Sequence, residues 1–94
     1  MDLESNERKL VNISSHLYWS GFQGKGRFEL YKYIFKSLNL EKYCNDIEVI
    51  RYFQDVDKNT SFFKEYKEDT DFCNYACNYI TKWVKDEKML KITK

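Results

Sequence analysis

The chain has no proline and only three glycines among its 94 residues. These residues most often interrupt helices and form turns, so their scarcity favours helices over a sheet rich in turns. No apolar run reaches the roughly 18 residues that span a bilayer, so we expect no membrane span in this chain. The first residues, Met1 to Ser5, are polar and acidic and do not resemble a secretory signal. A cytoplasmic chain is expected on these grounds, unless the chain is a fragment or is exported by another route.

The sequence also lacks an excess of charge of one sign. It has 16 lysines and arginines against 15 aspartates and glutamates, which gives a net charge of +1. Because nucleic-acid binding needs a surplus of basic residues, the balance argues against a nucleic-acid partner. It also disfavours strong attraction to an anionic membrane surface. Neither nucleic acid nor a membrane surface is therefore expected as a partner, and the sequence does not specify the identity of a protein partner or the oligomeric state.

Aromatic residues, in contrast, are abundant and make up 18% of the chain. A chain of this length fits one domain, so we predict a single helical domain over residues 1–94. A few aromatic side chains are expected to stay outside the core, because a domain of this size cannot readily hide all of them. Aromatic residues at helical spacing usually form the core, and exposed ones are frequent in protein interfaces.

Apolar residues recur at spacings of three and four along the chain, which predicts helices. The predicted fold class is all-α, a compact bundle of four to five helices with a long C-terminal helix. The expected helices cover about residues 5–18, 28–38, a third from Asn45, a short one near 62–66, and 71–91. Asn45 with Glu48 resembles a capping box, and either Asp69 or Thr70 is expected to cap the last helix. The segment Gly21 to Gly26 is predicted to be a loop.

Three cysteines, Cys44, Cys73 and Cys77, allow at most one internal disulfide. Cys73 and Cys77 lie one helical turn apart, where a bridge between them would strain the helix. A bridge from Cys44 to either one would close a loop of about 30 residues and stabilise the fold by roughly 3 to 4 kcal/mol. The alternatives are three buried thiols, or a zinc site that adds His16, the only histidine.

No catalytic residue, metal site or cofactor is predicted. Zinc motifs usually hold closely spaced cysteines in knuckles, whereas Cys73 and Cys77 fall within a predicted helix. A pair of His16 with a cysteine lacks the third orienting group that nucleophilic catalysis needs. The paired carboxylates of the chain lie in polar, loop-like segments that are typical of solvated surface. The protein is therefore expected not to be an enzyme.

The segment from Cys77 to Asp86, CNYITKWVKD, resembles the pattern Cys-x-Tyr-Leu-x-x-Trp-Leu-x-Asp of one protein family. The family is the interspersed-repeat variant antigens of malaria parasites, the PIR/VIR superfamily. The upstream Tyr43-Cys44 pair, followed by a predicted helix, is also similar to the amino-terminal part of that family, as is the lysine-, asparagine- and tyrosine-rich composition. The strong part of the resemblance covers about ten residues.

The resemblance implies a helical, disulfide-bearing ectodomain that is exported or shown on the host-cell surface. It implies roles in adhesion, receptor binding and immune evasion. Cys44, Cys73 and Cys77 would be the disulfide cysteines, and Tyr79, Ile80 and Trp83 would belong to the core. The chain departs from the family because members are commonly several times longer, with a transmembrane helix and a basic tail.

Two functional hypotheses follow from the sequence. The first is a non-enzymatic, exported or cell-surface interaction domain of the variant-antigen type, which binds a host protein or evades immunity. The alternative is an intracellular helical adaptor or regulator, viral or phage-like, that binds a partner protein in an aromatic groove. The first hypothesis expects a disulfide, and the second expects reduced cysteines.

Overall fold

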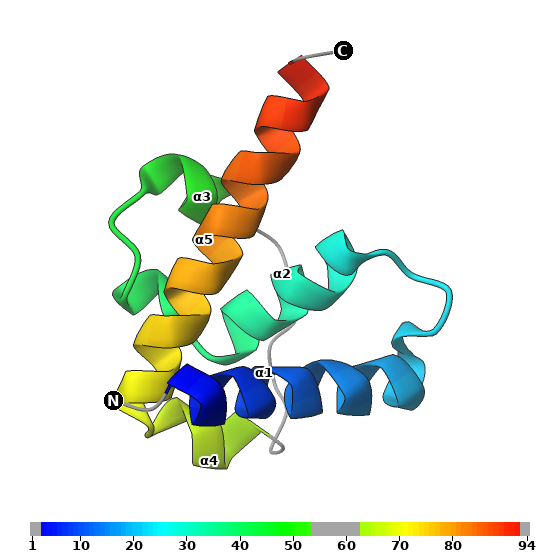
Figure 1. Cartoon of the computed structure of the whole chain (residues 1–94), viewed down its shortest axis with the longest axis vertical. Coiled ribbons are helices and arrows are strands. Elements are labelled where there is room, and N and C mark those ends of the chain that lie inside the picture. Colours follow the sequence, from blue (N-terminus) through cyan, green and yellow to red (C-terminus); the bar gives the residue numbers. More distant parts are fainter. Residues whose placement is uncertain (1–2, 54–62, 93–94) are drawn as a thin grey trace.

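The structure is a computed structural model that describes residues 3–53 and 63–92. These residues fold into helices joined by turns, and this part of the chain contains no strand. Figure 1 shows a compact arrangement in which the long C-terminal helix crosses the shorter helices. The predicted all-α bundle with a long last helix is confirmed. Within the two described ranges, no helix has both the length and the apolar character needed to cross a bilayer.

The first helix, α1, spans Leu3–Leu17. Its buried stripe consists of Leu10, Ile13 and Leu17. Because these positions are three and four residues apart, they share one helix face. The chain then continues through a wide helical turn, η1, Tyr18–Phe22, whose backbone leaves the helical conformation at Gly21, the first residue of the predicted loop. Gly21 has a φ of 153°, which glycine adopts without a steric penalty, and it breaks the regular turn there.

The second helix, α2, spans Arg27–Ser37, and a short 3-10 turn, η2, follows at Leu40–Lys42. Asn39 separates them with a φ of 58°, in the left-handed region. Asparagine visits that region more readily than most residues, because its short polar side chain can bond to nearby backbone. Asn39 therefore ends α2 and redirects the chain into η2.

The third helix, α3, spans Ile47–Tyr52, and Asp46 is its N-cap residue. The Asp46 carboxylate accepts hydrogen bonds from the backbone amides of Glu48 at 3.0 Å and Val49 at 3.3 Å. The predicted capping box at Asn45 was therefore one residue too early. An aspartate in this position satisfies two free amides and places a negative charge at the helix amino terminus, where it is stabilised.

The last two helices are α4, Lys64–Lys67, and α5, Thr70–Ile92. Both lie within a few residues of the predicted positions. The polar segment Asp55 to Asn59, whose composition predicts a loop, lies outside the described residues.

The core gathers on one face of α5. The buried side chains of this helix are Phe72, Cys73, Ala76, Cys77, Ile80 and Val84. They repeat at intervals of three and four, as one helix face requires. Within the same cluster, Phe35 of α2 stacks on Phe53 with ring centroids 5.0 Å apart. Tyr31 of α2 meets Trp83 of α5 edge to face at 5.2 Å, so α2 closes directly onto α5.

The Asp69 side chain caps the amino terminus of α5 and also forms an ion pair with Lys9 of α1. One carboxylate oxygen accepts from the Phe72 amide at 3.0 Å, and the other accepts from Lys9 Nζ at 2.7 Å. The Asp69 carbonyl accepts from the Cys73 amide at 2.9 Å, which is the first turn of the helix. Asp69, rather than Thr70, is therefore the capping residue.

We predict that Asp69→Ala lowers the free energy of unfolding by about 1 kcal/mol, because the Phe72 amide loses its cap. Thr70→Ala is the matched control, since Thr70 is exposed and adjacent to the cap. Urea denaturation followed by circular dichroism measures both. Equal losses for the two variants would contradict the assignment of the cap.

A second prediction concerns acid stability. The Lys9 ammonium and then the Phe72 amide hold the pKa of Asp69 below its ordinary value. A carboxyl with a depressed folded pKa stabilises the fold above its unfolded pKa of about 4, and this contribution disappears as the pH falls through the folded pKa. Asp69→Asn keeps a capping side chain that does not titrate. We therefore expect the wild type to lose more unfolding free energy than Asp69→Asn between about pH 5 and pH 2.

Candidate functional site

Two of the three cysteines lie next to each other in the core. Cys44 belongs to the segment between η2 and α3, and Cys77 belongs to α5. Cys44 Sγ is 3.7 Å from Thr81 Oγ1, which is one turn along α5 from Cys77. Burial raises the pKa of the Cys77 thiol to about 11, and the neighbouring Cys44 thiol contributes to the increase. The structure therefore brings these two cysteines together as adjacent thiols.

Cys73 has different partners. Its Sγ donates to the Tyr66 carbonyl at 3.4 Å and lies 3.8 Å from the Lys67 carbonyl, both at the end of α4. Burial raises the pKa of this thiol as well. All three cysteines are buried and free. Of the two candidate partners on α5, Cys77 is the one that faces Cys44.

The zinc alternative needs His16 beside these thiols. His16 lies exposed in the last turn of α1, whereas the three cysteines are buried. No cluster of three or more potential metal ligands occurs in the part of the chain that the structure describes.

The residues of the family-like segment occupy three different environments. Ile80 is fully buried, and Trp83 is partly buried against Tyr31 of α2. Tyr79 is 39% exposed, so it lies at the surface instead of in the core as expected. Tyr79 sits on the edge of the buried face, where its hydroxyl can stay solvated while part of its ring packs.

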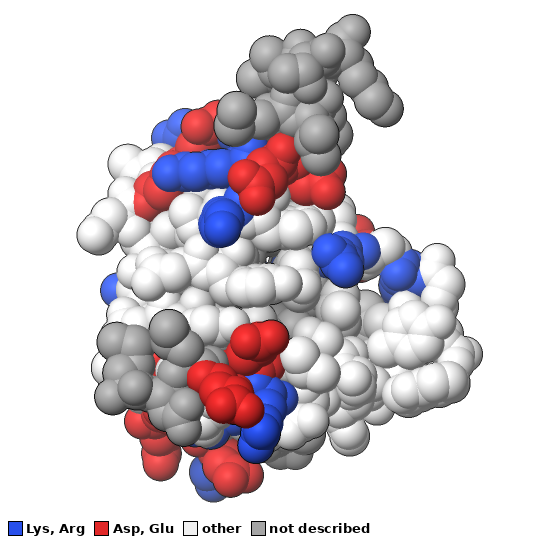
Figure 2. Space-filling view, viewed as in Figure 1, with Lys and Arg blue, Asp and Glu red and all other residues white. Residues whose placement is uncertain are grey.

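The turn Tyr18–Phe22, named here the Trp19 turn, presents aromatic side chains to solvent. Trp19 is 73% exposed and Tyr18 is 43% exposed, with their rings edge to face at 5.3 Å. Figure 2 shows an uncharged surface at the end of the molecule where α1 turns into α2, with basic groups beside it. Sequence reasoning missed this feature. A signal was present, because no lysine, arginine, aspartate or glutamate occurs from Leu10 to Gly24.

A hollow of about 300 Å³, named here the tyrosine groove, lies between α1, α2 and α5. Its tyrosines are Tyr31, Tyr75 and Tyr79, and Val11 and Arg27 also line it. The Tyr31 hydroxyl donates to the Tyr79 hydroxyl at 3.4 Å. Burial, and then the Tyr79 hydroxyl, raise the pKa of Tyr31, so its hydroxyl stays neutral and available for hydrogen bonding.

Comparison with known proteins does not extend the resemblance. No protein-family model matches the chain, and no curated protein or solved structure matches it significantly. The family resemblance of the segment from Cys77 to Asp86 thus stays a hypothesis, and the function must be argued from the geometry of the site.

The cysteine geometry gives a third prediction. When the protein is held with oxidised glutathione, we expect a disulfide between Cys44 and Cys77, with Cys73 free. Closing a loop of about 30 residues in this way stabilises the fold by roughly 3 to 4 kcal/mol. The reaction should accelerate as the pH rises toward the Cys77 pKa of about 11, because the thiolate is the nucleophile.

Non-reducing peptide mass spectrometry identifies the linked pair. Cys73→Ser is the matched control and should leave the bridge intact, whereas Cys77→Ser should abolish it. A bridge from Cys44 to Cys73, or three free thiols after prolonged oxidation, would contradict the prediction.

Proposed function

We propose that this chain is a non-enzymatic protein-interaction domain of the exported variant-antigen type, which binds a host protein. The observation that carries the proposal is the exposed Trp19 turn. A tryptophan that is 73% exposed leaves a large apolar ring in water, which is unfavourable unless a partner covers it. Tryptophan and tyrosine are also the residues most enriched among binding hot spots.

The Cys44 and Cys77 pair supports the location outside the cell. Adjacent buried thiols from distant parts of the chain can form a bridge where the compartment is oxidising, and bridges of this kind are common in small secreted domains. In a reducing compartment the same two side chains would act only as small apolar residues.

The tyrosine groove favours a second candidate, an intracellular adaptor that binds a partner protein between α1, α2 and α5. Tyr31, Tyr75 and Tyr79 supply aromatic rings, and Arg27 supplies a charge at the rim. This candidate expects all three cysteines to stay reduced. The two candidates therefore differ in the surface that they use and in the state of the cysteines.

The fourth prediction separates the candidates by two substitutions. The labelled domain is titrated onto host cells, red cells included, and binding is measured by flow cytometry. For the exported interaction domain we expect Trp19→Ala to weaken binding at least about tenfold, because a hot spot contributes 2 kcal/mol or more. Ile47→Ala is the control, since Ile47 is an apolar side chain that is 64% exposed on α3, outside both surfaces.

Tyr79→Ala tests the groove. Saturable binding that Tyr79→Ala weakens and Trp19→Ala leaves unchanged would replace the first candidate by a groove-binding one. Absence of saturable binding to host cells, together with three free thiols in protein alkylated inside its native cell, would favour the intracellular adaptor.

A further inference from the structure

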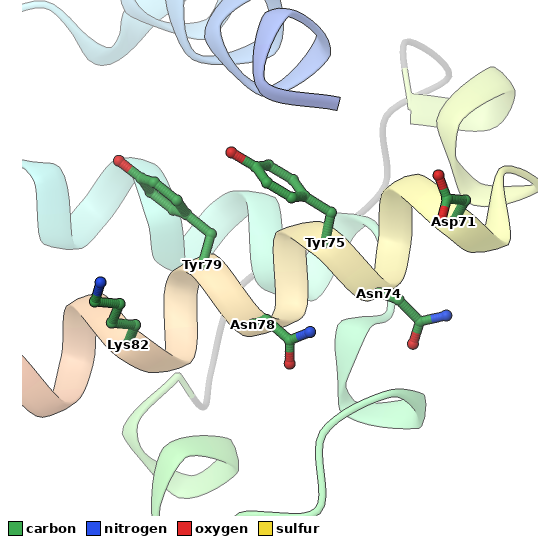
Figure 3. A pocket seen from close by; sticks show the side chains of 6 residues that line it. All are labelled: Asp71, Asn74, Tyr75, Asn78, Tyr79 and Lys82. Carbon is green, nitrogen blue, oxygen red and sulfur yellow. The ribbon is translucent and has the colours of Figure 1, made fainter. Parts of the chain in front are cut away.

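The solvent face of α5 carries a regular set of six polar and aromatic side chains. Together they line one shallow hollow: Asp71, Asn74, Tyr75, Asn78, Tyr79 and Lys82. Their spacing of three and four residues places them on one face of the helix, named here the α5 outer face. Figure 3 shows the two tyrosines pointing to one side of α5 and the two asparagines to the other, with Asp71 and Lys82 toward the two ends.

This face is complementary to itself when the helix is turned end for end. If a second α5 is laid against it in the opposite direction, Asp71 faces the partner's Lys82. In the same register Tyr75 faces the partner's Tyr79, and Asn74 faces the partner's Asn78. All three pairings are centred at residues 76–77, so one two-fold axis satisfies them together. An interface between identical subunits needs this property, because each contact occurs twice.

We propose that two copies of this chain associate through the α5 outer face, with their α5 helices antiparallel. The proposal does not rest on the exported interaction function. The contact between the two α5 helices does not include the Trp19 turn. The partner on this face is a second copy of the chain, because the opposite charges at the two ends of the face match only when the partner helix is reversed.

The local contacts leave the charged groups available. One Asp71 oxygen accepts from the amide of buried Asn6 at 3.0 Å, which orients the carboxylate while its other oxygen can accept from a partner. Lys82 forms no ion pair with any residue in the described ranges. In the dimer, Asp71 would pair with the partner's Lys82, and Lys82 would pair with the partner's Asp71. The same ion pair would therefore form twice across the interface.

The aromatic side of the face supplies apolar area. Tyr79 is 39% exposed and Tyr75 is partly buried, so their rings offer flat surface to the partner's rings. Val11 of α1 is 55% exposed and lines the tyrosine groove beside them. The face is narrow and largely polar, so we expect a weak, reversible dimer that salt weakens further.

Sedimentation equilibrium from about 10 µM to about 1 mM should show a monomer and dimer in exchange, as for a weak interface. Lys82→Glu and Asp71→Lys each place like charges at both symmetric contacts, and each should weaken the dimer at least about tenfold. The double variant exchanges the charges and should restore it. Lys64→Glu, which changes an exposed lysine of α4 off this face, is the matched control and should have no effect.

Mixing the two single variants gives an independent result. One chain then presents two lysines and the other presents two acids, so the mixture should form a heterodimer more tightly than either variant self-associates. A wild type that stays monomeric throughout, a dimer that survives both charge reversals, or a double variant without recovery would overturn the proposal.

Zero-length carbodiimide cross-linking of the wild type avoids any substitution. Asp71 and Lys82 are eleven positions apart on one helix, which is about 16 Å along its axis, too far for a direct amide bond within one chain. A cross-linked peptide pair joining Asp71 to Lys82 must therefore come from two chains. Its absence in concentrated protein would overturn the proposal even if Asp71→Lys fails to fold after losing its Asn6 contact.

Discussion

The burial of one face of α5 is the constraint on which the rest of the structure depends. This helix has 23 residues, whereas α3 has 6 and α4 has 4. Helices shorter than about 12 to 15 residues are marginal in water, so α3 and α4 exist only because they pack onto a larger element. The buried positions from Phe72 to Val84 provide that element, and they set the direction in which each neighbouring helix can lie.

Charged contacts then orient α3 on α5. Asp46 at the start of α3 pairs with Lys85 at 3.2 Å, and Glu48 pairs with Lys88. Because ion pairs between exposed side chains contribute little free energy, these contacts orient α3 more than they stabilise it. They also occupy the far end of α5 with intramolecular pairs, which leaves Lys82 as the basic residue on its outer face.

The sequence predicted what depends on local periodicity and missed what depends on distant partners. Leu10, Ile13 and Leu17 repeat at helical spacing because burial imposes it, so the helix was predictable. Asn45 and Asp46 are both good caps, and the choice between them involves Lys85, which is remote in sequence. The cysteine partner was undecided for the same reason, since Cys73 is held by carbonyls of α4.

The aromatic residues are divided by their chemistry, and the division decides which of them reach the surface. Phe35, Phe53, Phe63 and Phe72 are fully buried, whereas Tyr31 is the one tyrosine in the buried core. A phenyl ring loses nothing polar on burial, but a phenol must keep its hydroxyl hydrogen-bonded. Tyrosines therefore collect at the boundary, where their rings face both the core and solvent. Trp19 lies beyond that boundary with little packing, so the fold alone gives no reason for its exposure, which is why the Trp19 turn carries the proposed interaction.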